Sequence, residues 1–144
     1  MTSFSMDKLY EELATDEGKV LHTYLDSLGF LTIGIGHLVA DDEFEEGDTI
    51  TEEQCFEIFK KDVQTAIFRL GKVYPHYSNL TDARQRALIN MTFNMGMKLA
   101  NFKMMLAALD AGNYDEAANQ MLNSLWAHQV GDRAKRLAQM MRAG

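Results

Sequence analysis

Residues 16–37 read DEGKVLHTYLDSLGFLTIGIGH, and this stretch indicates the fold more clearly than any other part of the sequence. After two acids and a glycine it becomes rich in β-branched and aromatic residues, which favour strands. Asp26 and Gly29 interrupt it as residues that favour turns. The pattern predicts a β-hairpin or a short meander within residues 20–40, which is the only good strand signal in the chain.

The residues before this stretch predict a first helix. Apolar side chains recur at helical spacing from Phe4 to Leu13. Gly18 lies just beyond the expected last turn, where a left-handed residue commonly stops a helix. We therefore expect the first helix to end near Asp16.

The residues after the hairpin predict an acidic loop and then a long helix. Residues 41–53 contain eight acids and no base, which is typical of a solvated loop. Thr51 and Gln54 match a capping box, and the apolar residues that follow recur at helical spacing. A helix is therefore predicted from about Glu52 to Leu70, and a helix of this length can join two lobes.

From Thr81 onward the sequence keeps a helical pattern that glycines interrupt. Three side chains in this part are predicted to cap helices: Thr81, Asn101 and Asp132. The fold class is therefore α+β and mainly helical, with a small β-sheet lobe of about residues 18–60. We expect a larger helical lobe of about residues 61–144 together with the N-terminal helix, joined to the small lobe by the long helix.

Composition limits the class of protein. The chain has 144 residues, 47% of them hydrophobic, which fits a single domain with a substantial core. Fourteen basic and 21 acidic residues give a formal charge of −7, which argues against nucleic acid as a partner. No apolar run approaches the roughly 18 to 20 residues of a membrane span, and the N-terminus lacks the pattern of a secretion signal, so we expect synthesis in the cytoplasm.

Motifs for metals, phosphates and nucleophiles are weak. The histidines lack ligand spacing, and a calcium-loop frame over residues 42–53 has Phe44 at a ligand position, so no metal site is expected. The glycines of Thr32–His37 lack the remainder of a phosphate-binding loop. Cys55, the only cysteine, is expected to be a small buried hydrophobe rather than a nucleophile.

Two carboxylates flank the predicted hairpin. Glu17 follows the expected end of the first helix, and Asp26 lies in the turn between strands. Glycoside hydrolysis needs such a pair, because one carboxylic acid protonates the leaving oxygen while the other carboxylate activates water or attacks the sugar. The negative end of the helix macrodipole favours the protonated form of Glu17. The spacing leaves a second interpretation open, in which both acids are surface residues without a catalytic role.

These residues belong to a longer pattern. DEG followed by TYLDSLGFLTIGIGH closely resembles the active-site segment of phage lysozymes of the T-even type, glycoside hydrolase family 24. The resemblance continues through RQRALINMTFNMG at residues 84–96 and SLWAHQVGDRAKR at residues 124–136, and it covers nearly the whole chain in order. It implies a lysozyme-like two-lobed fold and an inverting muramidase that uses no cofactor.

The resemblance also implies roles for individual residues. By position, Glu17 is the general acid, Asp26 is the carboxylate that directs the attacking water, and Thr32 helps to orient that water. Four further residues match cleft positions that contact saccharide in the family: Leu38, Phe93, Met105 and Gln120.

Three other positions match supporting residues of the family. His37 and Asp62 match a structural ion pair rather than catalytic groups. Arg133 matches a base near the general acid, and such a base favours ionised Glu17. The base and the helix end therefore oppose each other, and the sequence leaves open which one decides the ionisation of Glu17.

The implied function is that of an endolysin. Such an enzyme hydrolyses the β-1,4 bond between N-acetylmuramic acid and N-acetylglucosamine in bacterial peptidoglycan, for host cell lysis. We expect a monomer that is made in the host cytoplasm and reaches the periplasmic cell wall after holin-type release. The alternative is a non-catalytic peptidoglycan-binding or phage tail module on the same fold.

Overall fold

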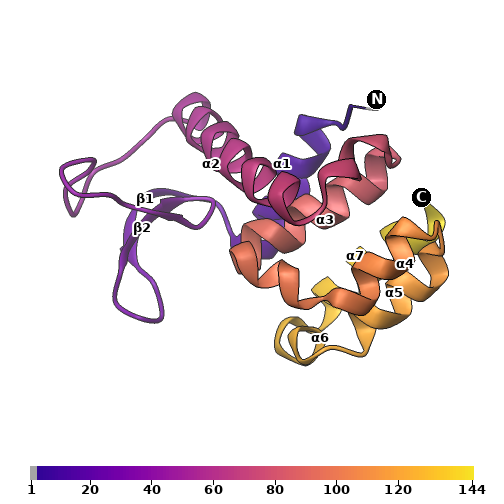
Figure 1. Cartoon of the computed structure of the whole chain (residues 1–144). Helices are drawn as coiled ribbons and strands as arrows, with labels where there is room; N and C mark the ends of the chain where they lie inside the picture. Colours follow the sequence, from indigo (N-terminus) through magenta and orange to yellow (C-terminus); the bar gives the residue numbers. More distant parts are fainter. Residues whose placement is uncertain (1–2) are drawn as a thin grey trace. The chain divides into compact units, whose positions relative to one another are not determined.

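The structure is a computed structural model that describes residues 3–144, and its elements can be followed in Figure 1. The helices and strands of the described residues are α1 (Met6–Glu17), β1 (Val20–Leu25), β2 (Leu31–Gly34), β3 (His37–Leu38), α2 (Glu52–Val73), α3 (Asp82–Met95), α4 (Lys103–Asp110), α5 (Tyr114–Leu122), α6 (Leu125–Val130) and α7 (Asp132–Ala143). Two short 3-10 helices, η1 (Pro75–Asn79) and η2 (Gly96–Asn101), precede and follow α3. The predicted α+β, mainly helical class is confirmed.

The three strands form one antiparallel meander in the order β1-β2-β3, as the sequence predicts. Tyr24 of β1 pairs with Thr32 of β2, and Thr32 pairs in turn with Leu38 of β3. Directly paired residues of antiparallel strands point to the same face of a sheet. The side chains of Tyr24, Thr32 and Leu38 therefore form one row across the sheet.

A carboxylate organises the turn between β1 and β2. Oδ1 of Asp26 accepts hydrogen bonds from the backbone N–H groups of Leu28 and Phe30, both at 2.9 Å. The N–H of Asp26 donates to the carbonyl of Phe30 at 2.9 Å, and Gly29 has a φ of +85°, which favours glycine. The turn thus holds the Asp26 side chain in a defined orientation at the end of β1.

Packing divides the chain into two compact units. One comprises residues 6–65, and the other comprises residues 66–144 together with residues 3–5. The first unit includes α1, which we expected in the helical lobe. Tyr10 of α1 explains this grouping, because its ring packs edge-on against Phe56 and Phe59 of α2 at centroid distances of 4.9 and 5.0 Å. The division falls within α2, between residues 65 and 66.

The core of the unit formed by residues 66–144 consists of aliphatic and methionine side chains. Those that are fully buried include Leu88, Ile89, Met91, Leu99, Met105, Met121 and Leu137. The indole N–H of buried Trp126 donates to Asn94 Oδ1 at 2.7 Å, which satisfies the polar edge of the ring. Arg84 holds the end of α7, because its Nε donates to the Met141 carbonyl at 2.8 Å while its guanidinium stacks on Tyr114.

The predicted capping box at the start of α2 is confirmed. The N–H of Gln54 donates to Thr51 Oγ1 at 3.1 Å, and the N–H of Thr51 donates to Gln54 Oε1 at 2.8 Å. Thr81 caps α3 as expected, because its side chain accepts a hydrogen bond from the N–H of Arg84 at 3.3 Å.

Two other predicted caps are wrong. Asn101 is the last residue of η2, and the N-cap of α4 is Phe102, whose side chain makes no capping bond. Asp132 is the first residue of α7 rather than its cap, because Gly131, with a φ of +58°, ends α6 and begins α7 directly. A 3-10 turn and a tight glycine connection therefore replace the side-chain caps that the residue types suggested.

Candidate active site

Glu17 is the last residue of α1, and its half-buried side chain lies against Gly36, between β2 and β3. Gly18 follows with a φ of +80°, so it stops the helix as predicted. Gly36 has a φ of +62°, and a Cβ placed there would lie 3.5 Å from Glu17 Oε2. Glycine therefore accommodates both the backbone conformation and the close approach of the carboxylate.

The turn and β2 supply the other two predicted catalytic side chains. The two backbone bonds that Asp26 accepts in the turn both involve Oδ1. Thr32 is 2% exposed, and its Oγ1 donates to the carbonyl of Phe30 at 2.9 Å. Because that bond uses the hydroxyl hydrogen, the remaining hydrogen-bonding capacity of Oγ1 is that of an acceptor.

An electrostatic effect links Glu17 and Asp26. Burial raises the pKa of the Tyr24 phenol, and the negative charges of Asp26 and then Glu17 raise it further. Both carboxylates therefore act on one side chain within residues 6–65. The position of Tyr24 near both charges was not predicted from the sequence, because aromatic residues are ordinary in a strand.

The predicted pair of His37 and Asp62 is present, and it contains a third member. His37 Nδ1 lies 2.7 Å from Asp62 Oδ2, and its Nε2 lies 2.9 Å from Glu43 Oε1. The hydrogen bond to Asp62 raises the pKa of His37 to about 9 against the opposing effect of burial, and the bond to Glu43 adds to the rise. With both ring nitrogens facing carboxylates, the imidazole is a doubly protonated cation at neutral pH.

Glu43 was not identified from the sequence, because it belongs to an acidic run that predicts a solvated loop. In the structure Ala40 donates its N–H to Glu43 Oε1 at 2.9 Å, which turns this carboxylate toward His37. Burial raises the pKa of Glu43, but the Ala40 N–H and the His37 cation outweigh it, so the pKa is lowered overall. The acidic loop is thereby anchored to the sheet and to α2.

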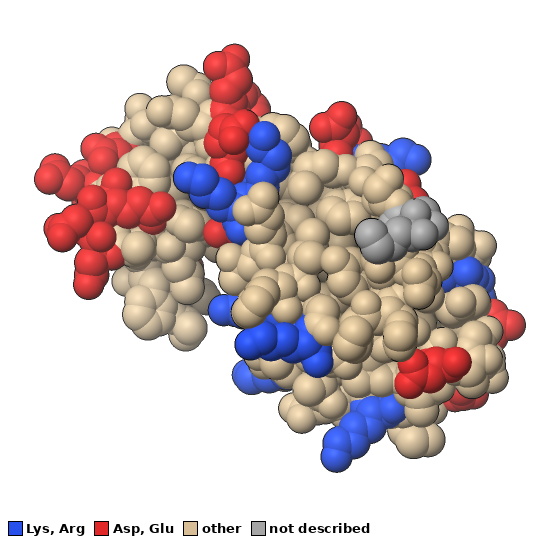
Figure 2. Space-filling model, turned by 45° about the horizontal axis from the view of Figure 1, so that its top comes forward, with Lys and Arg blue, Asp and Glu red and all other residues tan. Residues whose placement is uncertain are grey.

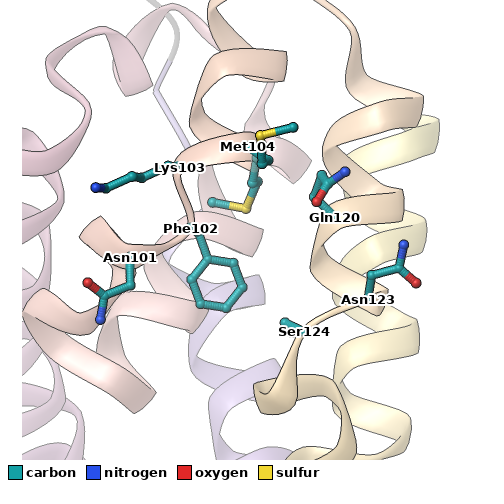
Figure 3. A pocket seen from close by; sticks show the side chains of 8 residues that line it. Asn101, Phe102, Lys103, Met104, Gln120, Asn123 and Ser124 are labelled. Carbon is teal, nitrogen blue, oxygen red and sulfur yellow. The ribbon is translucent and has the colours of Figure 1, made fainter.

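A pocket of about 270 Å³ lies within the other unit, between the start of α4 and the end of α5 (Figure 3). Its lining consists of Asn101, Phe102, Lys103, Met104, Met105, Gln120, Asn123 and Ser124. Figure 3 shows Phe102 and Met104 on one side of the pocket, with Gln120 and Asn123 on the facing side. An apolar floor with amides around it suits a ligand that has both apolar faces and hydroxyl or amide groups.

The pocket brings two of the predicted saccharide contacts together. Gln120 lines it and donates from Nε2 to Glu116 Oε1 at 2.9 Å, which orients its amide. Met105 also lines it but is fully buried, whereas the neighbouring Met104 is 66% exposed. Met104 is therefore the methionine with accessible surface here.

The other two predicted contacts lie elsewhere. Leu38, on β3, is 58% exposed and belongs to the sheet row with Thr32. Phe93 lies half-buried on α3, outside the lining of the pocket. Their contact with saccharide stays a prediction.

Arg133 is buried and held by an amide. Its Nε and Nη2 donate to Asn90 Oδ1 at 3.0 and 2.8 Å, and its exposed fraction is 8%. This bidentate arrangement fixes the guanidinium plane within the unit of residues 66–144. The expected influence of Arg133 on Glu17 stays a prediction.

Residues 3–144 contain no cluster suited to a metal ion and no helix suited to a membrane span. The side chains of His, Cys, Asp and Glu in this range form no group of three or more arranged to hold a metal ion. No helix in the same range is long and apolar enough to cross a membrane. Cys55 is free and 1% exposed, which confirms it as a small buried hydrophobe.

A helix end and a hairpin turn thus each present one carboxylate, within a mainly helical α+β fold that has a small meander sheet. This fold and this pair of acids match those of glycoside hydrolases of the lysozyme class. The family model for phage lysozyme matches residues 14–143, so the chain belongs to the phage lysozyme family. It is a lysozyme, a peptidoglycan-lysing glycosidase, as the sequence predicts.

Relatives of this chain include both lysis enzymes and a virion component. It is 29% identical to the probable T4-type lysozyme 1 of Dictyostelium discoideum, with 96% of each protein covered. It is 37% identical to the endolysin of Salmonella phage P22, covering 79% of this chain and 77% of that protein. It is also 32% identical to the pre-baseplate central spike protein Gp5 of Enterobacteria phage T4, covering 93% of this chain and 27% of that protein.

Proposed function

We propose that this chain is an endolysin muramidase that hydrolyses the β-1,4 bond between N-acetylmuramic acid and N-acetylglucosamine in bacterial peptidoglycan, for host cell lysis. The observation that carries the proposal is the carboxylate pair: Glu17 ends α1 and lies against Gly36, and Asp26 is held in the turn between β1 and β2. Membership of the phage lysozyme family supports it, as does similarity to a protein named endolysin.

Glu17 serves as the general acid. It stands at the C-terminal end of α1, and its side chain lies against Gly36. Its proton passes to the glycosidic oxygen as the bond between that oxygen and the anomeric carbon breaks. The leaving sugar then departs as a neutral alcohol.

Asp26 and Thr32 orient the attacking water, and Asp26 also deprotonates it. The Asp26 carboxylate takes a proton from the water as the water oxygen bonds to the anomeric carbon on the face opposite the leaving group, which inverts the configuration. Thr32 Oγ1, whose hydrogen is bonded to the Phe30 carbonyl, accepts the other hydrogen of that water. The pair is restored when a proton returns from Asp26 to Glu17 through solvent.

Saccharide binding is proposed at Leu38, Phe93, Met105 and Gln120. The pocket lined by Met105 and Gln120 supports this for one part of the glycan, because its apolar floor and oriented amide suit a sugar ring with an acetamido group. Exposed Met104 adds apolar surface at the same place. The enzyme is proposed to act as a monomer, without a cofactor and without nucleic acid as a partner.

The place of action follows from the substrate. We propose synthesis in the host cytoplasm, holin-type release, and action on the periplasmic cell wall.

Similarity to the spike protein Gp5 favours a second candidate function, a non-catalytic peptidoglycan-binding or tail module. The two candidates differ in whether Glu17 is needed for a chemical step.

Glu17→Gln tests the proposal, because glutamine keeps the shape of the side chain and carries no transferable proton. General acid catalysis contributes about 100-fold to 10,000-fold, or about 3 to 5 kcal/mol of barrier, so clearing of permeabilised Gram-negative cells should fall by that factor. Thermal melting of the variant should match the wild type or rise slightly, because a carboxylate at a helix C-terminus is unfavourable.

Glu11→Gln is the matched control, because it makes the same change at an exposed position of the same helix. It should keep the wild-type clearing rate. A Glu17→Gln rate above about a tenth of wild type would contradict the general-acid assignment. Nuclear magnetic resonance of the first-formed anomer, with a soluble glycan as substrate, tests inversion separately.

A further inference from the structure

Met104 lies outside the buried stripe of α4. The buried residues of this helix are Met105, Ala108 and Leu109, which recur at the spacing of one helix face. Met104 is 66% exposed, whereas Met105 is fully buried. Packing of the core therefore explains the apolar side chain of Met105, but it does not explain that of Met104.

The pocket between α4 and α5 supplies a reason for the exposed methionine. Met104 lines this pocket together with Phe102, and Figure 3 shows both across from Gln120. The Gln120 amide is oriented by its bond to Glu116 Oε1 at 2.9 Å. A polarisable thioether suits the apolar face of a sugar ring, and an oriented amide suits its acetamido group. Met104, rather than Met105, therefore has the surface that a bound saccharide can cover.

The same exposure makes the thioether of Met104 accessible to oxidants. Two methionines among residues 3–144 are exposed, Met104 at 66% and Met97 at 47%. Met97 belongs to η2 and lies outside the lining of the pocket. An oxidant must reach the sulfur to react with it, so the fully buried methionines should react more slowly: Met91, Met105, Met121 and Met141.

We propose that Met104 is an oxidation site that controls saccharide binding in this pocket, an inference that rests on the proposed function. Hydrogen peroxide transfers one oxygen atom to the thioether. The O–O bond breaks and an S–O bond forms, so the sulfur is oxidised by two electrons and the peroxide is reduced to water. The sulfoxide is polar, and covering it with the apolar face of a sugar costs free energy that covering the thioether does not. Oxidation of Met104 therefore weakens glycan binding, and methionine sulfoxide reductase restores it.

Met104→Leu is the direct test, because leucine is apolar, has a similar volume and has no sulfur to oxidise. Each protein is compared with itself before and after peroxide, and mass spectrometry of its peptides follows the conversion of each methionine. When Met104 of the wild type is converted, KM for soluble peptidoglycan strands should rise roughly tenfold, while kcat changes by less than about twofold. The same treatment should leave the KM of Met104→Leu at its untreated value.

Met97→Leu is the matched control, because it makes the same change at an exposed methionine outside the pocket. Its KM should rise on peroxide treatment as much as that of the wild type, and methionine sulfoxide reductase should reverse the rise. A wild-type KM that stays constant when Met104 is fully converted overturns the inference. A rise of equal size in Met104→Leu also overturns it.

A binding measurement does not depend on the activity of the enzyme. Methionine labelled with ¹³C at the methyl group gives a separate nuclear magnetic resonance signal for each side chain, and Met104→Leu and Met97→Leu assign the two that matter. Addition of tetra-N-acetylchitotetraose should shift the Met104 signal and leave that of Met97 in place. After peroxide treatment, roughly tenfold more of the oligosaccharide should be needed to reach half of its binding. An unshifted Met104 signal, or an unchanged affinity after oxidation, overturns the inference.

The outcomes for Met104 and for the proposed function are distinguishable. If the wild type clears cells, Glu17→Gln does not, and oxidation of Met104 leaves KM unchanged, only the inference on Met104 fails. If Glu17→Gln retains activity, the proposed function fails, whatever the oxidation experiments show.

Discussion

The two compact units of this lysozyme carry opposite charge. Residues 6–65 contain sixteen acids and four bases, a formal charge of −12, whereas residues 66–144 contain five acids and ten bases, a formal charge of +5. Figure 2 shows acidic side chains crowded at the left of the view, whereas basic side chains are spread over the remainder of the visible surface with a few acids among them. The net charge of −7 therefore describes neither unit. We expect any electrostatic attraction to an anionic cell wall to come from residues 66–144.

The two units also hold their polar groups differently. In the acidic unit, His37 is held by the carboxylates of Asp62 and Glu43, and its pKa is raised to about 9. In the basic unit, the buried guanidinium of Arg133 is held by the neutral amide of Asn90. The stabilisation that His37 gives to residues 6–65 should therefore depend on pH. The stabilisation that the bonds between Arg133 and Asn90 give to residues 66–144 should not.

The largest expected effect concerns Arg133 and Asn90, whose contribution to stability should not depend on pH. Asn90→Ala leaves the guanidinium of Arg133 without the acceptor at 3.0 and 2.8 Å, and the loss of a buried hydrogen bond to a charged group costs about 2 to 3 kcal/mol. Urea unfolding at pH 6 and pH 10 should give the same loss. Asn79→Ala, at an exposed asparagine, is the control and should cost less than about 0.5 kcal/mol.

Asp62→Asn tests the pH-dependent stabilisation that His37 gives to residues 6–65. The folded pKa of His37, about 9, is above its unfolded value of about 6.5, so its stabilisation is fully present below pH 6.5 and is lost as the pH rises through 9. The whole shift corresponds to about 3 kcal/mol shared with Glu43, so Asp62→Asn should cost about 2 kcal/mol at pH 6.

The same variant should cost almost nothing at pH 10, where His37 is neutral. Glu43→Gln should show a smaller loss over the same range, because the bond to Asp62 is the larger cause of the shift. Melting curves at the two pH values measure both variants. An equal loss at pH 6 and pH 10 in Asp62→Asn would remove the ion-pair interpretation.

The opposite charges predict opposite effects on adhesion to purified peptidoglycan. Neutralising the exposed Lys98, Lys103 and Lys135 to glutamine should weaken sedimentation with the wall about tenfold in 0.01 M salt, where the Debye length is about 30 Å. Neutralising three exposed acids of the loop should strengthen it: Asp41, Glu45 and Glu46. Both effects should nearly vanish in 1 M salt, and effects of the same sign would show that net charge alone governs adhesion.

The smallest expected effect compares one helix cap in each unit. Thr51 makes a reciprocal capping box with bonds of 3.1 and 2.8 Å, whereas Thr81 accepts a single bond of 3.3 Å. Thr51→Ala should therefore cost about 1 kcal/mol and Thr81→Ala about 0.5 kcal/mol. Chemical denaturation measures both values, and an equal or larger loss for Thr81 would contradict the geometric argument.

Local signals account for what was predicted correctly about the fold. The meander within residues 20–40, the long helix α2 and the cap at Thr51 each depend on residues only a few positions apart. Asn101 and Asp132 were misjudged, because a residue that favours a cap does not act as one when a 3-10 turn or a glycine already connects the helices. Residue type thus indicates which residues can cap a helix, and the conformation of the connecting segment decides which of them does.

Some features of the candidate site were predicted from the sequence, and others were not. Glu17, Asp26 and Thr32 were predicted from the sequence because a single segment carries all three and resembles the active-site segment of the family. The pocket lined by Phe102 and Gln120 was not found as a pocket, because α4 and α5 each look like an ordinary amphipathic helix. Only their packing creates the space between them.

By itself, the sequence determined the order of the elements, the acidic pair around the hairpin and the family, because these depend on residue type and spacing along the chain. The tertiary structure decided which other groups meet across long separations, such as Arg133 with Asn90 and Trp126 with Asn94. It also decided the protonation of His37, because a pKa depends on distances and burial that the order of residues does not specify. Packing likewise assigned α1 to the acidic unit, through aromatic contacts that no local pattern encodes.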